Sequence, residues 1–97
     1  MDAGLVITLG RAPDCTLVFD DARMSARHAQ LESLGDGTFR LTDLGSRNGT
    51  FIDDSGMLVR VEAATTVRAA QRLRFGDCEA TVRELFDMAR DPGRRHR

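Results

Sequence analysis

The sequence predicts an all-β domain whose short strands pack as a sandwich or close into a barrel. Two observations lead to this prediction. Alternating or β-branched runs recur along most of the chain, and clusters of Gly, Asp, Asn, Pro and Ser interrupt them about every ten residues. Short strands at such spacing are typical of sandwiches and barrels.

The first two predicted strands lie on either side of a turn. Residues 5–9 are rich in β-branched residues and have a glycine at each end. Residues 10–14 predict a turn, because Pro13 fixes φ and the aspartate after it can accept a hydrogen bond from nearby backbone. Residues 16–19 predict the second strand, and residues 20–27 an irregular loop.

Most of the remaining chain also reads as strands. The further runs that predict strands are residues 28–33, 39–41, 50–52, 57–61, 72–75 and 78–84. Turn formers connect them at residues 35–37, 53–56 and 76–77, and a loop rich in turn formers spans residues 44–49.

The C-terminal part predicts a change of structure. Residues 84–90 favour one or two helical turns. We expect the folded domain to occupy residues 1–86 and residues 87–97 to form a basic, disordered tail.

Composition predicts one globular domain and restricts its partners. The chain has 97 residues, of which 41% are apolar and 30% charged, as in ordinary soluble domains. A net charge of −1 is unlike that of a nucleic-acid binder. All 14 basic residues are arginines, whose planar guanidinium suits carboxylate or phosphate.

The two cysteines, Cys15 and Cys78, have no metal-ligand spacing. Free thiols in a reducing compartment fit them better than a disulfide, although the sequence leaves both open. No apolar segment has the length of a membrane span, and there is no signal peptide, so we expect a cytoplasmic protein without membrane contact. We also expect no cofactor and no metal.

The candidate site residues fall in three turn-like stretches. Arg11, Ser25 with His28, and the run of residues 46–50 each precede a strand-like run. A guanidinium, hydroxyls and a side-chain amide are donors for an oxyanion that lies beside a peptide backbone. Ser25, His28 and Asp43 lack the spacing of a hydrolytic triad, so no enzyme is predicted.

These stretches, in this order and spacing, resemble the forkhead-associated (FHA) domain family. Gly10-Arg11, then Ser25-x-x-His28, then the run from Asp43 to Phe51 carry the resemblance, which covers about residues 5–84. It implies a sandwich of two twisted, mostly antiparallel sheets. It also implies a phosphothreonine-peptide site in the loops at one end, and hence a non-catalytic module in serine/threonine-kinase signalling.

The resemblance also implies individual roles. Arg11 and Ser25 would grip the phosphate, Arg47 would add a phosphate contact, and Asn48 would hold the peptide main chain. Arg27 would contact phosphate or peptide backbone. The residues expected to support the site are Gly10, His28, Gly49 and Thr50.

Three departures from the family pattern qualify this expectation. Ala26 follows the motif serine where the family often has a polar residue, and residues 53–56 replace a common Asn-Gly turn. The family also has further strands before the Gly-Arg turn, so the strand of residues 78–84 would lack a neighbour. We therefore expect marginal stability as a monomer, or a homodimer or strand-swapped form that completes the sheet. Phosphate-independent assembly through this edge is the alternative function.

Overall fold

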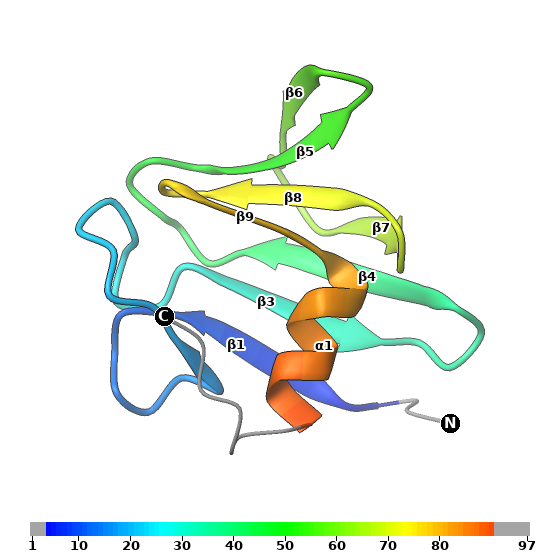
Figure 1. Cartoon of the computed structure of the whole chain (residues 1–97), viewed down its shortest axis with the longest axis horizontal. Coiled ribbons are helices and arrows are strands. Elements are labelled where there is room, and N and C mark those ends of the chain that lie inside the picture. The colour runs from blue at the N-terminus through cyan, green and yellow to red at the C-terminus, as the bar shows by residue number, and fades with distance from the viewer. Residues whose placement is uncertain (1–3, 91–97) are drawn as a thin grey trace.

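The computed structural model describes residues 4–90, which form two β-sheets and a helix (Figure 1). The strands are β1 (Val6–Gly10), β2 (Leu17–Val18), β3 (Ala29–Ser33), β4 (Thr38–Asp43), β5 (Thr50–Asp54), β6 (Met57–Arg60), β7 (Thr65–Arg68), β8 (Arg72–Phe75) and β9 (Cys78–Thr81). The helix α1 (Val82–Arg90) follows β9 directly. The expected sandwich of two sheets is confirmed.

Each sheet has a simple order. The first is β2-β1-β3-β4-β7 and the second is β6-β5-β8-β9. All pairs are antiparallel except β1 with β2. Since β4 belongs to the first sheet and β5 to the second, the loop between them crosses from one sheet to the other at the end where the candidate residues lie.

The core lies between the sheets and follows the alternation in the sequence. In β3, Ala29 and Leu31 are fully buried, whereas Gln30 and Glu32 are only half-buried. Successive side chains of a strand point to opposite faces, so alternation places one apolar row in the core. The buried apolar cluster comprises Ile7, Leu9, Met24, Ala29, Leu31, Leu41, Val61, Val67, Leu73, Phe75, Val82, Leu85 and Phe86.

Helix α1 begins earlier than the sequence led us to expect. The strand expected over residues 78–84 ends at Thr81, because Thr81 and Glu84 form a capping box. The Glu84 amide donates to Thr81 Oγ1 (3.1 Å) and the Thr81 amide donates to Glu84 Oε1 (2.8 Å). Two orphan amides at the helix start are thereby satisfied.

Helix α1 ends at Arg90, as expected for the helical turns of residues 84–90, and so extends beyond the expected domain boundary at residue 86. Leu85 and Phe86 are buried, and the Phe86 ring lies 5.0 Å from the Phe39 ring of β4 between centroids. Residues 87–90, which we had assigned to the tail, continue the helix because Met88 and Ala89 pack against the core. The rest of the expected tail, residues 91–97, lies outside the described residues.

Two features of the sheets bear on the expected unpaired edge. Within residues 4–90, strand β9 pairs with β8 alone and therefore lies at the edge of its sheet, as expected. Strand β6 forms the opposite edge of the same sheet. The sequence analysis missed β7, whose four residues include only one buried side chain, Val67, and so carry no clear alternation.

Candidate functional site

The three loops that carry the candidate residues meet at one end of the sandwich. The segments after β1, before β3 and between β4 and β5 lie together on the left of Figure 1. They form a shallow pocket of about 310 Å³. The pocket is lined by Arg11, Ala22, Arg23, Met24, Ser25, Ala26, Arg47 and Asn48. Four of the five residues expected to contact a ligand thus share one concavity.

Gly10 lets the Arg11 loop approach the Ser25 loop. The Arg11 amide donates to the Ser25 carbonyl (3.1 Å), and the Ala12 amide to the Ala26 carbonyl (3.0 Å). A Cβ atom on Gly10 would lie 2.2 Å from the Ala26 carbonyl oxygen, which is closer than any non-bonded contact allows. Glycine is therefore required at this position for steric reasons.

Ser25 presents its hydroxyl to the pocket while its amide is already engaged. The Ser25 amide donates to Nδ1 of His28 (3.1 Å), so this nitrogen acts as an acceptor. Ser25 Oγ accepts from the Arg47 amide (3.0 Å), which leaves the hydroxyl proton for a ligand. The next amide, that of Ala26, has no acceptor within residues 4–90 and is available as a backbone donor.

His28 joins two of the loops from inside the protein. Its side chain is fully buried, and Nε2 lies 2.9 Å from the Gly49 carbonyl oxygen. With Nδ1 accepting from the Ser25 amide, Nε2 carries the proton and donates to Gly49. The histidine touches the amide of Ser25 and not its hydroxyl, so the pair does not activate a nucleophile.

Asn48 ties the second loop to the third with one half of its amide. Nδ2 donates to the Arg23 carbonyl (2.8 Å), which fixes the side chain and leaves Oδ1 able to accept from a bound peptide. The next residue, Gly49, has φ of 92°, and a Cβ there would lie 3.1 Å from the Phe51 ring. Gly49 thus keeps the turn tight and close to the sheet.

Asp43 organises the loop that carries Arg47 and Asn48. Its Oδ1 accepts from the hydroxyls of Ser46 (2.6 Å) and Thr50 (2.7 Å). Its Oδ2 accepts from the amides of Gly45 (3.1 Å) and Ser46 (3.0 Å). Partial burial opposes ionisation, but these hydrogen bonds outweigh it and lower the pKa of Asp43. The loop is therefore held in place before any ligand arrives.

The arginines near the pocket fall into two groups. Arg11 and Arg47 have no acidic partner within the described part of the chain, so their guanidinium groups are free to bind an anion. Arg23 is paired with Asp77, its Nε lying 3.4 Å from a carboxylate oxygen. Arg27, which we expected to contact the ligand, binds Asp14 instead and does not line the pocket.

Asp21 is a supporting residue that the sequence analysis missed. Its carboxylate accepts from the amides of Arg23 (2.9 Å) and Asp77 (2.8 Å), and these bonds lower the pKa of Asp21. It thereby fastens the Ser25 loop to the β8–β9 turn. The supporting role of Asp43 and the contact made by Arg23 were missed as well. Asp43 has a local signal, since an aspartate two residues before Gly-Ser often accepts from the following amides.

The cysteines and the potential metal ligands do not indicate a second kind of site. Both cysteines are free, and burial is the main cause that raises the pKa of Cys78 to about 11. Between residues 4 and 90, no group of three or more His, Cys, Asp or Glu side chains is placed to hold a metal ion. No helix in the same range is long and apolar enough to cross a membrane.

Comparison with known proteins identifies the family. The model of the FHA domain matches residues 7–76. The chain belongs to the FHA domain family. It is 44% identical over 64 residues to the FHA domain-containing protein FhaB of Mycobacterium tuberculosis, a match that covers 64% of this chain and 41% of FhaB. This FHA chain therefore corresponds to less than half of that relative's length.

Solved structures agree with this assignment of an FHA fold. The FHA domain of the CT664 protein from Chlamydia trachomatis superposes with a TM-score of 0.72 at 26% identity, covering 81% of this chain and 76% of that one. EmbR of Mycobacterium tuberculosis, solved in complex with a low-affinity phosphopeptide, gives a TM-score of 0.69 at 29% identity. That match covers 78% of this chain and 19% of EmbR.

Proposed function

We propose that this FHA domain binds a phosphothreonine-containing segment of a partner protein and performs no catalysis. The observation that carries the proposal is the shared pocket of Arg11, Ser25, Arg47 and Asn48, in which both arginines lack an acidic partner within residues 4–90. The resemblance of the chain to EmbR, a protein solved with a phosphopeptide, supports it. Such a partner would be a substrate of a serine/threonine kinase in the cytoplasm.

The donors of the pocket match the charge and shape of a phosphate ester. A phosphorylated threonine carries about −1.5 to −2 charge and three acceptor oxygens. Arg11 and Arg47 supply opposite charge, and the Ser25 hydroxyl and the Ala26 amide supply short, directed donors. Oδ1 of Asn48 would accept an amide of the ligand backbone beside the phosphothreonine.

The same contacts suggest modest, reversible affinity. Hydrogen bonds to charged groups contribute about 1.5–3 kcal/mol each. Three or four of them, less the cost of ordering a flexible peptide on an exposed surface, correspond to about −8 kcal/mol, or micromolar affinity. Affinity in this range would let the complex form and dissociate as the kinase and phosphatase act.

Calorimetry with a phosphothreonine peptide library and its unphosphorylated twins tests the proposal. We expect micromolar binding of phosphorylated peptides alone. Arg11→Ala should weaken it by about 2–4 kcal/mol, because the phosphate loses its main countercharge. Arg27→Ala is the matched control, since Arg27 pairs with Asp14 outside the pocket, and it should bind nearly as the parent does. Equal binding of both peptide forms, or an unaffected Arg11→Ala variant, would leave phosphate-independent assembly as the function.

A further inference from the structure

The free edge of β6 carries an exposed apolar surface. Met57, Leu58 and Val59 expose 69%, 43% and 46% of their area. The hairpin of β5 and β6 extends away from the first sheet at the top of Figure 1. Exposed apolar edge strands can pair with other chains unless charge, proline or a covering segment prevents it. None of the four residues of β6 is proline, and only Arg60 is charged.

The peptide groups that point outward from this edge can be assigned. Ser55 and Gly56 both have positive φ (56° and 89°), as in a two-residue type I′ turn, which is closed by a hydrogen-bonded pair, Asp54 with Met57. Hydrogen-bonded and non-hydrogen-bonded pairs alternate along an antiparallel ladder. The Val61 amide donates to the Thr50 carbonyl (2.8 Å), as expected if Asp54–Met57, Ile52–Val59 and Thr50–Val61 are the hydrogen-bonded pairs. The N–H and C=O groups of Leu58 and Arg60 therefore face away from β5.

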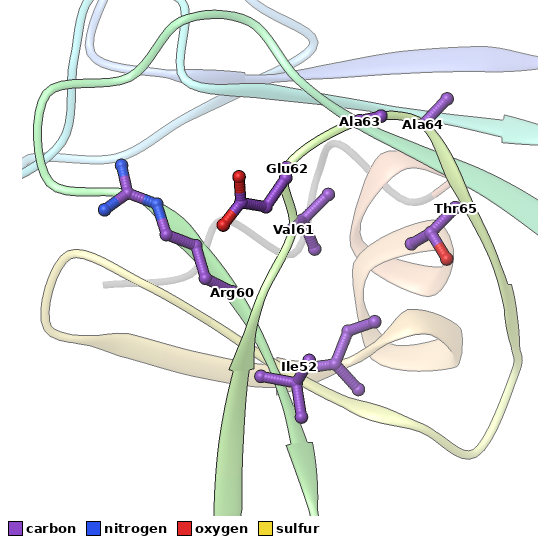
Figure 2. A pocket seen from close by; sticks show the side chains of 8 residues that line it. Ile52, Arg60, Val61, Glu62, Ala63, Ala64 and Thr65 are labelled. Atoms are coloured by element: carbon purple, nitrogen blue, oxygen red, sulfur yellow. The ribbon is translucent and has the colours of Figure 1, made fainter.

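An apolar groove lies beside the same strand on the inner face of the hairpin. Figure 2 shows the side chains of Ile52, Val61, Ala63, Ala64 and Thr65 around it. Its volume is about 280 Å³, and Val59 and the charged residues Arg60 and Glu62 also line it. Because side chains alternate along β6, Met57 and Val59 point to this inner face, whereas Leu58 and Arg60 point to the outer face.

We propose that β6 is a homodimer interface, in which two copies of this chain pair antiparallel about a two-fold axis at Val59. In this register, Leu58 of each copy pairs with Arg60 of the other, and the outward N–H and C=O groups of both residues form four hydrogen bonds. Val59 meets the second copy's Val59, and Met57 lies opposite the second copy's Val61, at the groove. The edge is thus complementary to itself in both hydrogen bonding and shape.

Charge also favours the register centred on Val59 over the register centred on Leu58. On the outer face, Leu58 is flanked on β5 by Asp53. The guanidinium of Arg60 lies over the Phe51 ring of its own copy, 6.0 Å from the ring centroid. On turning outward, the second copy's Arg60 would lie across Leu58, two strand spacings or about 10 Å from Asp53, which an arginine and an aspartate side chain can span together. A register centred on Leu58 would instead place Arg60 opposite Gly56, whose amide is already held by Asp53 (2.9 Å). That register would therefore lose hydrogen bonds.

The proposed interface lies at the opposite edge of the sheet from the one that the sequence analysis expected. The sequence analysis placed the unpaired edge at β9. That strand exposes Glu79, and its other side chains are half-buried, whereas every residue of β6 is exposed. Strand β6 is therefore the stronger candidate for pairing.

A charge-swap experiment by sedimentation velocity tests the proposal. Asp53→Lys and Arg60→Glu each create two like-charge contacts in their own homodimer, whereas a mixture of the two variants restores two opposite-charge contacts. We expect the parent to approach twice its monomer mass between about 10 µM and 1 mM, as suits a small interface. Each variant alone should associate about tenfold more weakly, and the mixture should recover to within about threefold of the parent.

Two further variants keep the result interpretable. Val59→Lys places a charge on the two-fold axis without altering Asp53, and it should abolish association. Arg83→Glu, an exposed change on α1, should leave association unchanged. A parent that remains monomeric up to 1 mM overturns the proposal and leaves the edge to an extended segment of a different protein. Association that survives both Arg60→Glu and Val59→Lys overturns it as well.

Discussion

The long loops at the pocket and the two-residue turn of the β5–β6 hairpin are stabilised in opposite ways. In the loops, polar side chains of residues far apart in sequence bind one another's backbone, as His28 does with Gly49 and Asn48 with Arg23. The hairpin is held mainly by the backbone hydrogen bonds between β5 and β6 and by the hydrogen bond from the Gly56 amide to Asp53. Few other side chains contact it. Substitutions in the loops should therefore alter both stability and binding, whereas equivalent substitutions in the hairpin should leave binding unchanged and lower stability less.

The largest effect is expected at Asp43. Asp43→Ala removes the acceptor of four hydrogen bonds and leaves the hydroxyls of Ser46 and Thr50 without their partner. We expect the free energy of unfolding in urea to fall by about 2–4 kcal/mol and phosphopeptide binding to fall with it. Asp54→Ala in the hairpin removes an exposed carboxylate and should change unfolding by less than about 0.5 kcal/mol.

The pH dependence of stability gives a second readout of the Asp43 substitution. The folded protein lowers the pKa of Asp43 below the value of about 3.9 that it has when unfolded. The ionised carboxylate therefore stabilises the fold above about pH 4, and this contribution is lost as the pH falls through the folded pKa. The unfolding free energy of Asp43→Ala should decline less steeply below pH 4 than that of the parent. Identical slopes would mean that other carboxylates, such as Asp21, carry the dependence.

A smaller difference in stability is expected between alanine substitutions at two glycines, Gly10 in a pocket loop and Gly56 in the hairpin turn. Gly10→Ala forces a Cβ against the Ala26 carbonyl, so the Arg11 and Ser25 loops must separate. We expect a loss of about 1–3 kcal/mol in unfolding and at least tenfold weaker phosphopeptide binding. Gly56→Ala meets no atom within 4 Å and suffers only from its φ of 89°. It should cost about 1 kcal/mol in stability and leave binding intact. Equal loss of binding in both variants would contradict the distinction between the regions.

The contrast also explains how much of the molecule could be predicted from sequence. Alternation located most strands because burial on one face of a sheet imposes it, as in β3 and β8. The capping box at Thr81 and Glu84 is equally local and would have placed the start of α1. Strand β7 could not be found in this way, since its identity depends on pairing with β4 and not on its own pattern.

The sequence located candidate site residues where they form a motif, but not where their partners are distant in the chain. Arg11, Ser25, Arg47 and Asn48 occur at the expected places and share the pocket. Arg27 pairs instead with Asp14, which is brought close only by the fold. Asp21 fastens the Ser25 loop to a turn near the end of the chain, and no local pattern indicates such a contact. Charge pairing across the fold therefore decides which arginines remain available to a ligand.

The smallest effect should come from Val59→Thr on the exposed edge of the hairpin. The substitution keeps a β-branched side chain of similar shape at a position where 46% of the valine is exposed, so it leaves no cavity and buries little polar area. In dilute solution the free energy of unfolding should stay within about 0.5 kcal/mol of the parent, and phosphopeptide affinity should not change. A loss above 1 kcal/mol in urea unfolding would show that Val59 is packed in the monomer. The β6 edge would then belong to the core of this chain and not to a surface open to a second copy.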